Sequence, residues 1–240
     1  MAAITEDGNR ASGAVSTAVA SIRDMIRRGE LSPGEPVRQQ NMAERLQMSR
    51  VPIREALHTL QTEGLLRHDR NRGYFVVKFN ADQLRELYLM RALLETALLK
   101  HLRWPDEEQI RAIEDINKEL ARIAELGPIA RLAQLNRQFH EAIFNLSPLE
   151  TVHQEISRLW EMSDSYRALY LAGPARYRTV LEHDEMIEAL RAQDLDWLID
   201  CADKHRRASE QAVARMLDMR SAAAAPDAPP AVTESSAETR

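Results

Sequence analysis

Four prolines and one polar pair break the last two-thirds of this chain into pieces of helix length, and this spacing constrains the fold most strongly. The breaks are Trp104-Pro105, Gly127-Pro128, Ser147-Pro148, Gly173-Pro174 and Gln193-Asp194. A residue that precedes proline disfavours the helical conformation, so helices usually end there. The predicted helices are 82–102, 106–126, 128–146, 148–171, 175–193 and 195–218. Six helices with short connections predict an antiparallel bundle.

The first 78 residues carry a different pattern, in which helix-like stretches precede two strand-like runs. Apolar residues at helical spacing predict a helix at 15–28 and a shorter one at 39–48, joined by the Gly/Pro-rich connection GELSPGEPV. Ser49 is a typical N-cap for a third helix, which Gly64 ends. The runs LLRHD and GYFVVKF around a Gly-containing turn predict a β-hairpin. Three helices and a hairpin in this order predict a winged helix-turn-helix.

These patterns together predict a mainly α protein of two domains. The winged helix-turn-helix is placed at 13–78, and an all-helical domain for effector binding, metal binding and dimerisation at 79–220. Residues 1–12 are small and polar, and residues 221–240 are rich in Ala, Pro, Ser and Glu, a composition that cannot form a core. Both ends are expected to be disordered.

Charge and cysteine content narrow the class of protein. Residues 1–78 hold 12 Lys and Arg against 9 Asp and Glu, whereas residues 79–240 hold 20 against 28. A mildly basic head on an acidic body suits a protein that presents one end to phosphate groups. No apolar run approaches the roughly 20 residues of a membrane span, and no signal peptide is visible at the start. With a single cysteine, Cys201, the chain is expected in the reducing cytoplasm.

Arginines mark the surface expected to read DNA. Arg50 and Arg54 lie one turn apart at the start of the third helix, on the face opposite to its apolar stripe. The first turn of that helix enters the major groove in helix-turn-helix proteins, and arginine bonds guanine or phosphate with two N–H groups. Arg70 and Arg72 lie at the hairpin tip, where a wing would contact the neighbouring backbone. The alternative is that these are surface arginines of a protein-binding module.

The stretch SRVPIREALHTLQTEGL, within residues 15–78, resembles the winged-helix head of GntR-type transcription regulators. The resemblance implies that this head contacts DNA through Arg50, Arg54 and Gly73 with its neighbour Arg72, and Ser49 and Pro52, which flank the helix arginines, are included in the predicted surface. One position departs from the pattern: Gln40 stands where the family usually has an arginine. Glutamine still bonds a base or phosphate without the charge, so we expect a different operator sequence.

Three histidines interrupt apolar helical stripes in the C-terminal half. They are His140, His183 and His205, and Asn136 precedes the first of them by one turn. A single histidine on an apolar face is usually a core residue bonded to a backbone carbonyl. Three that face inward in one bundle also fit a divalent ion, because imidazole suits Zn²⁺ or Ni²⁺. The spacing alone leaves both interpretations open.

The segments ALLETALLKH, NRQFHEAI and EHDEMIEAL, followed by a terminal histidine, resemble the all-helical FCD sensor domain of the FadR-type branch, and six helices suggest its VanR-like subgroup. This resemblance implies a metal held by Asp, His, His and His, which here correspond to Asn136, His140, His183 and His205. Asparagine is a weaker ligand than aspartate for a hard cation, which predicts reduced metal affinity.

Arg91 and Glu95 lie on the buried stripe of the first bundle helix, and Arg167 lies on the long fourth one. A buried ion pair four residues apart is the simpler interpretation of Arg91 and Glu95. The alternative makes Arg91 a clamp for the carboxylate of an effector, with Glu95 beside it and Arg167 as a weaker candidate.

The leading hypothesis is therefore a homodimeric transcription regulator that binds a double-stranded DNA operator. The family resemblance implies a repressor controlled by a small organic acid, bound at or near the metal. A metal-dependent enzyme that uses the three histidines is one alternative, although the chain has no HExxH motif and no nucleophile motif. A protein-binding adaptor is the other, and only the run Gln39-Gln40-Asn41 favours it.

Overall fold

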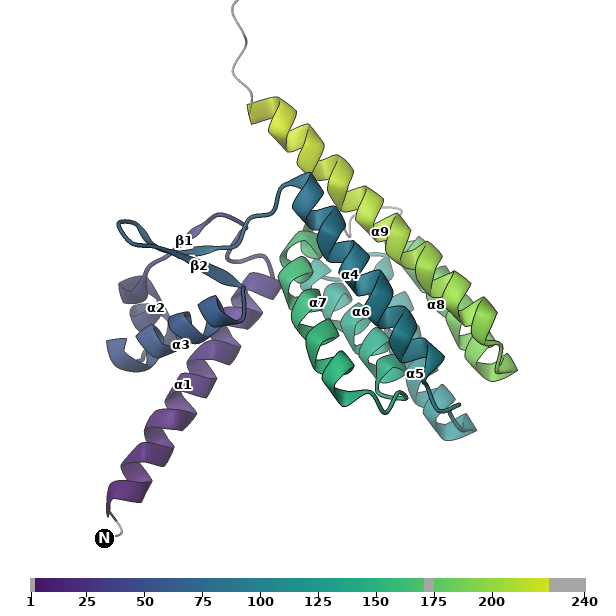
Figure 1. Ribbon diagram of the computed structural model, residues 1–240, viewed down its shortest axis with the longest axis horizontal. Coiled ribbons are helices and arrows are strands. Elements are labelled where there is room, and N and C mark those ends of the chain that lie inside the picture. The colour runs from purple at the N-terminus through teal and green to yellow at the C-terminus, as the bar shows by residue number, and fades with distance from the viewer. Residues whose placement is uncertain (1–2, 171–174, 225–240) are drawn as a thin grey trace, which may run out of the picture.

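The computed structural model describes residues 3–170 and 175–224, with α and β elements that form a small head and a larger helical body (Figure 1). The head consists of α1 (Ala3–Arg27), β1 (Pro36–Val37), α2 (Gln39–Leu46), α3 (Arg50–Thr62), β2 (Leu66–Asp69) and β3 (Gly73–Val76). The body consists of α4 (Ala81–Lys100), α5 (Glu107–Ala124), α6 (Ile129–Phe144), α7 (Glu150–Tyr170), α8 (Ala175–Ala192) and α9 (Leu195–Ala224). The predicted mainly α fold is thus confirmed.

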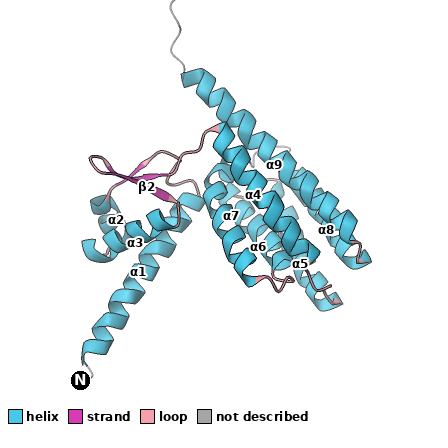
Figure 2. Ribbon diagram, viewed as in Figure 1, coloured by secondary structure: helices cyan, strands magenta, loops and turns pink. Residues whose placement is uncertain are grey.

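The head packs three helices beneath a small antiparallel sheet, drawn in magenta in Figure 2. Its strands lie in the order β1-β3-β2, with Pro36 opposite Phe75 and Leu66 opposite Val76. The stripe predicted on α3 is the centre of the core, since Ile53, Ala56, Leu57 and Leu60 are fully buried. Strand β1 was not predicted, because its two residues fall within the Gly/Pro-rich connection and are too short to show an alternating pattern.

The six body helices form the predicted bundle, in which α4 packs on α7 and α9 while α5 packs on α6 and α8. Two starts are fixed by capping boxes: Asn80 and Gln83 exchange side-chain and backbone hydrogen bonds before α4, and Asp106 and Gln109 do so before α5. The helices begin and end within a few residues of the predicted limits. Among the described residues, none of the helices combines the length and apolarity that a membrane crossing requires.

Both chain ends differ from expectation. Helix α1 begins at Ala3 and includes residues 3–12, which were predicted to be disordered. Helix α9 continues to Ala224, past its predicted end at residue 218 and into the tail predicted to be disordered, of which residues 225–240 lie outside the described residues. In both places the residues adjoin a helix or are rich in alanine, which favours helix. Adding residues to an existing helix costs less free energy than nucleating a new one. Composition alone underestimates this effect.

Candidate functional site

The first turn of α3 presents two arginines to solvent. Arg50 and Arg54 are exposed, whereas Ile53 and Leu57, on the opposite face, are fully buried. Neither arginine forms an ion pair with any residue that the structure describes. Both guanidinium groups are therefore available to an anionic partner, and DNA phosphates and guanine edges are such partners.

Ser49 occupies the N-cap position of α3, with extended backbone, but its side chain makes no capping hydrogen bond. The predicted N-cap position of Ser49 is correct, but the capping hydrogen bond expected from its side chain is not formed. The reason lies three residues on, because Pro52 is the third helical residue and has no N–H to offer. The exposed Ser49 hydroxyl is consequently not engaged by the helix it precedes.

The hairpin tip carries the second basic group. Asp69 accepts the backbone N–H of Asn71 at 3.0 Å, and its carbonyl accepts that of Arg72 at 3.2 Å, which closes the turn. Gly73 follows with φ +86°, a conformation that favours glycine. Arg70 and Arg72 are exposed, and the Arg72 guanidinium lies 5.2 Å from the centre of the Phe75 ring. The ring supports the arginine at the wing.

Helix α2 lies beside the start of α3. Gln39 Nε2 donates to the carbonyl of Arg50 at 2.7 Å, so this glutamine fastens the two helices together. Gln40 is exposed and donates to Glu44 at 3.1 Å. Gln40, Ser49 and Arg50 border one open hollow of about 370 Å³. Three of the residues predicted to contact DNA thus share one concave surface, whereas Pro52 and Arg54 do not line it.

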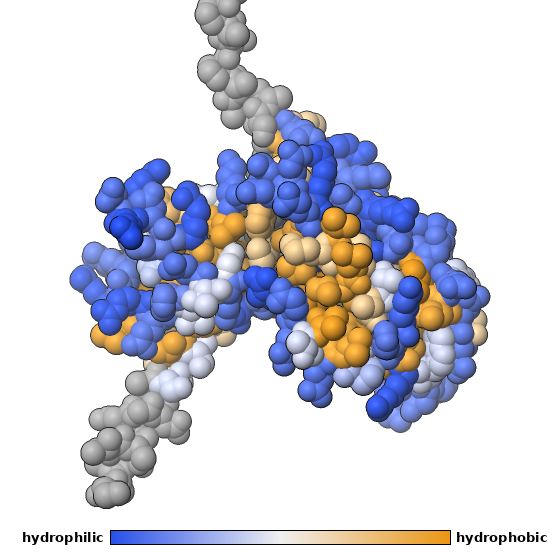
Figure 3. Space-filling model, in the orientation of Figure 1, coloured by the Kyte–Doolittle hydropathy of each residue, from blue (hydrophilic) through white to orange (hydrophobic). Residues whose placement is uncertain are grey.

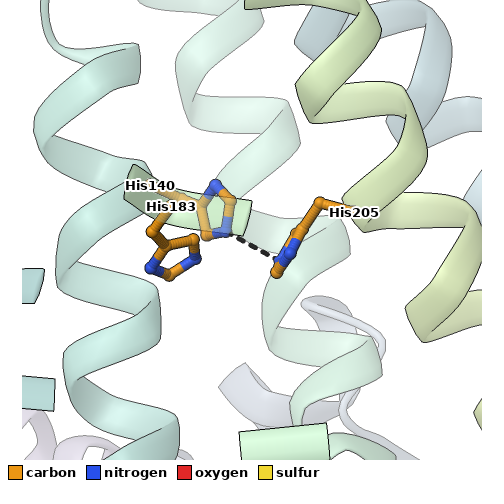
Figure 4. Close-up of side chains that lie close together, drawn as sticks. All are labelled: His140, His183 and His205. Carbon is orange, nitrogen blue, oxygen red and sulfur yellow. Dashed lines mark hydrogen bonds between the residues drawn. The ribbon is translucent and has the colours of Figure 1, made fainter. Parts of the chain in front are cut away.

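The three histidines meet inside the body, each from a different helix (Figure 4). His140 comes from α6, His183 from α8 and His205 from α9, and all three are buried. One ligand nitrogen of each lies within 4.8 Å of the others, and His140 Nε2 lies 3.2 Å from His205 Nε2. Two nitrogens that bind one ion at about 2.1 Å lie roughly 3.0–3.4 Å apart, so this pair fits a shared metal.

Hydrogen bonds to the outer ring nitrogens fix how two of these histidines are protonated. Asn117 Nδ2 donates hydrogen bonds to the Val180 carbonyl and to Asp184. Asn117 Oδ1 therefore faces His183 Nδ1 at 3.1 Å and accepts a hydrogen bond from its N–H. Glu182 accepts from His205 Nδ1 at 2.7 Å. Each ring therefore carries its proton on the outer nitrogen and turns Nε2 inward. Metal-binding histidines are commonly held in this way.

Asn136, the expected fourth ligand, is 1% exposed and lies one turn before His140 on α6. Its Nδ2 atom is buried and has no hydrogen-bond partner among the described residues. Rotation of the amide would bring its oxygen to that place. A buried amide nitrogen without a partner, one helical turn from His140, leaves room for Asn136 to serve as a further ligand to an ion held by the histidines.

A buried charge cluster adjoins the histidines. Glu95 accepts from Arg91 Nε at 3.0 Å, from Arg206 Nη1 at 2.7 Å and from Trp160 Nε1 at 2.8 Å. Burial opposes the charge on Glu95, but Arg91 and Arg206 together hold its pKa below the ordinary value. Arg91 also lies 4.2 Å above the Trp160 ring. The simpler interpretation of Arg91 and Glu95, a buried ion pair, describes what the structure contains.

The same cluster and the histidines line one small cavity. Arg91, Glu95, Arg206, His140 and His205 all contribute to its wall. Its volume is about 10 Å³, room for about one water molecule. Sequence reasoning missed Arg206, which follows His205 directly and carried no separate signal. The side chain of Arg167, the third effector candidate, lies outside the described residues.

Ion pairs connect this region to the head. Arg137, one turn before His140 on α6, lies 2.7 Å from Asp164 and 3.8 Å from Glu161 of α7. Glu161 lies 3.0 Å from Arg23 of α1, and Arg23 donates at 2.5 Å to Glu63 at the end of α3. Burial raises the pKa of Glu161, and Arg23 and Arg137 partly offset that rise. A chain of charges thus runs from the histidine helix to the helix that carries Arg50 and Arg54.

A second connection holds the linker between the two parts. The backbone N–H of Phe79 donates to the Tyr166 hydroxyl of α7 at 2.6 Å. Arg158 of the same helix donates to the carbonyl of Glu63 at 3.4 Å. Helix α7 is therefore the body element on which the head and its linker rest (Figure 1).

A winged head with exposed arginines, joined to a helical body with a buried polar site, is the arrangement of a two-domain DNA-binding transcription regulator. Residues 14–76 match the family described as bacterial regulatory proteins, gntR family, and residues 86–208 match the FCD domain. The chain therefore belongs to the GntR family of bacterial regulators, with an FCD domain as its C-terminal part. This membership sets aside the metal-dependent enzyme as an interpretation.

Individual relatives agree with this placement. The chain is 27% identical over 176 residues to the regulator YdhC of Bacillus subtilis, spanning 72% of this chain and 79% of YdhC. It is 28% identical over 177 residues to the regulator McbR of Escherichia coli, spanning 72% and 80%. The solved structure of McbR/YncC superposes with a TM-score of 0.71 over 87% of this chain and 98% of that one, at 22% identity. The two proteins therefore share the fold.

Proposed function

We propose that this regulator is a homodimeric repressor whose affinity for its operator is controlled by a small carboxylate bound at the histidine site. His140, His183, His205 and Asn136 would hold a divalent transition ion there, Zn²⁺ or Ni²⁺. The ion would supply positive charge for the effector carboxylate. The observation that carries the proposal is that two of the three clustered imidazoles, His140 and His205, line one cavity with the buried Arg91 and Arg206.

The DNA-reading surface is proposed to comprise Gln40, Ser49, Pro52, Arg50 and Arg54 on the helices, with Arg70, Arg72 and Gly73 at the wing. Six of these residues are exposed, Pro52 and Gly73 are partly exposed, and no described residue forms an ion pair with Arg50 or Arg54, which supports this assignment. The adaptor alternative is weakened, because Gln39, the first residue of the run that favoured it, has a structural role in joining α2 to α3.

The size of the cavity supports the idea that binding changes shape. A carboxylate with several heavy atoms cannot enter a space of about 10 Å³, so it would bind only an arrangement in which the walls have moved. Arg91 and Arg206, both paired with Glu95, would exchange part of that pairing for the effector. A ligand shifts a conformational equilibrium only if it binds the two conformations with different affinity. The effector would bind the opened cavity and not the closed one, so this condition would be met.

The charge chain supports a route by which that movement reaches DNA. Arg137 lies on the same helix as His140, and Glu161 and Arg23 continue the chain to Glu63 at the end of α3. Displacement of α6 would alter the ion pairs of Glu161 with Arg137 and Arg23. The position of α1 and α3 relative to the body would then change. The two heads of a dimer would then lose the spacing that matches two operator half-sites.

The test begins with operator fragments selected from genomic DNA by the purified protein. Operator binding is measured by fluorescence anisotropy with Zn²⁺ and a panel of mono- and dicarboxylates, for wild type and for the double variant His140→Ala with His183→Ala. We expect a carboxylate to weaken binding of wild type only. If the double variant responds equally, the histidine site is not the sensor, and if no fragment is selected, the assignment of the reading surface is wrong.

A further inference from the structure

A second hollow in the body, the loop pocket, lies where α4 and α6 end. The loop after α4 and the loop before α7 border it, and its volume is about 300 Å³. The two loops are joined, because the backbone N–H of Arg103 donates to the carbonyl of Leu146 at 2.9 Å. In the space-filling view, hydrophobic and hydrophilic surface lie next to each other at the lower end of the body, where α4 ends (Figure 3). None of the described residues that line the loop pocket also lines the histidine cavity.

The polar side chains of the loop pocket all carry hydrogen-bond donors. They belong to Arg103, Gln109, Asn145 and Ser147. Arg103 is exposed and forms no ion pair with any residue that the structure describes. The described lining contains neither aspartate nor glutamate. The wall therefore presents one positive charge and no negative one, which suits a ligand with a single negative charge.

Local structure leaves two of these donors available to a ligand. Gln109 belongs to the capping box of α5, in which its Oε1 accepts the backbone N–H of Asp106 at 3.0 Å, so its Nε2 group is the part left to donate. Ser147 Oγ is buried and has no hydrogen-bond partner among the described residues. Buried hydroxyl groups in proteins are nearly always paired, so this one indicates a place for the oxygen of a ligand.

The rest of the wall is apolar and includes an indole ring. Trp104 is 36% exposed, and Leu146 and Pro148 complete the described lining. The backbone holds Trp104 in place from both sides, because Arg103 is bonded to Leu146 and Pro105 is buried. An exposed indole at the edge of a pocket favours stacking with another aromatic ring.

We propose that the loop pocket binds an aromatic monocarboxylate, separately from the effector at the histidine site. The carboxylate pairs with the Arg103 guanidinium through two N–H groups, and the ring packs against Trp104. Gln109, Asn145 and Ser147 donate to the carboxylate or to a polar substituent on the ring. A phosphate monoester fits less well, since it carries close to two negative charges and the described wall offers one cation. This inference goes beyond the proposed function, which requires no second ligand.

Fluorine NMR of the full chain tests the site, with benzoate as the probe. The chain has three tryptophans, and replacing them by 5-fluorotryptophan gives three resonances. Trp104→Phe and Trp197→Phe assign two of these resonances and leave the third to Trp160. Trp104 lines the loop pocket and Trp160 lines the histidine cavity, so the two sites report separately. Benzoate should shift the Trp104 resonance until the site is saturated and leave the Trp197 resonance unchanged.

Variants test the role of the arginine. Arg103→Ala should weaken benzoate binding at Trp104 at least ~10-fold, because hydrogen bonds to a charged group are lost. Alanine keeps the backbone N–H that bonds Leu146, and far-UV circular dichroism verifies that the variant folds. The matched control Arg122→Ala, at an exposed arginine in the last turn of α5, should bind benzoate as wild type does.

Two analogues of the probe test the ligand class. Benzamide keeps the ring without the charge and should bind at least ~10-fold more weakly than benzoate. Cyclohexanecarboxylate keeps the charge without the aromatic face and should bind roughly 3-fold more weakly. Equal affinity for benzamide would overturn the assignment of a carboxylate, and equal affinity for cyclohexanecarboxylate would overturn that of an aromatic acid.

The outcomes separate this inference from the proposed function. A shift of the Trp160 resonance alone places benzoate at the histidine site, which overturns the loop pocket and leaves the proposed function in place. No shift at millimolar benzoate, or equal affinity of Arg103→Ala and wild type, also overturns the loop pocket. A Trp104 shift that persists in the double variant His140→Ala with His183→Ala supports a separate site, even if the histidine site proves not to be the sensor.

Discussion

Replacing Glu182 by glutamine should weaken metal binding without touching a ligand. The carboxylate of Glu182 accepts from His205 Nδ1 at 2.7 Å, and its side chain is 20% exposed. Glutamine keeps the size and an acceptor oxygen but removes the charge that strengthens the donor power of His205 Nε2. Arg178 lies 3.2 Å from the same carboxylate and already neutralises part of that charge.

The size of the effect follows from these contacts. A hydrogen bond to a charged group contributes about 1.5–3 kcal/mol, and one between neutral groups about 1 kcal/mol. After allowance for the partial exposure of Glu182 and for Arg178, the loss should be roughly 1–2 kcal/mol, which corresponds to about 5- to 30-fold weaker binding of Zn²⁺.

The assay is a competition titration of Zn²⁺ against a chromophoric chelator at constant pH. Glu185→Gln, on the exposed side of α8, is the matched control and should bind Zn²⁺ as wild type does. Thermal unfolding of the metal-free proteins checks that neither change disturbs the fold. Equal affinity of Glu182→Gln and Glu185→Gln, or no Zn²⁺ binding by wild type, would refute the reasoning.

Four further outcomes are expected. Arg54→Ala should abolish specific operator binding in anisotropy assays, whereas Arg111→Ala, on the exposed surface of α5, should not. Operator affinity of the wild type should also fall steeply with salt concentration because phosphate contacts release counterions, and an affinity that does not change with salt would contradict the predicted phosphate contacts. Asn136→Asp should tighten Zn²⁺ binding in the chelator assay, since a carboxylate is the stronger ligand, and unchanged affinity would remove Asn136 from the site. Glu161→Gln should reduce the effect of Zn²⁺ and carboxylate on operator affinity by about fivefold, or about 1 kcal/mol of coupling, and a full response would show that the charge chain is not the route. Burial, and then the nearby Glu185, raises the pKa of Cys201 to about 11, so native protein at pH 8 should react with iodoacetamide at least ~100-fold more slowly than unfolded protein.

Much of the architecture could be predicted because it depends on local rules. Proline breaks placed the body helices, and the apolar stripe of α3 correctly separated buried Ile53 from exposed Arg54. Histidines on apolar stripes were correctly expected to face inward, because a helix turns residues three or four apart to one side. Strand β1 escaped prediction because two residues, Pro36 and Val37, cannot display a period.

The surroundings of the site could not be predicted, because they depend on contacts between distant segments. Arg206 pairs with Glu95 across 111 positions, and Asn117 orients His183 across 66. Glu182 resembles any surface glutamate on α8 until α9 brings His205 beside it. Ser49 shows the opposite failure, in which a sound local rule was cancelled by Pro52 three residues later.

The near absence of free volume between α4, α6 and α9 has a consequence for timing. A ligand larger than water cannot enter until these helices separate, so at high ligand concentration the rate of entry would level off at the rate of opening. Escape would wait for the same event. A regulator with such a closed pocket would ignore brief pulses of its signal and answer only to a concentration that lasts.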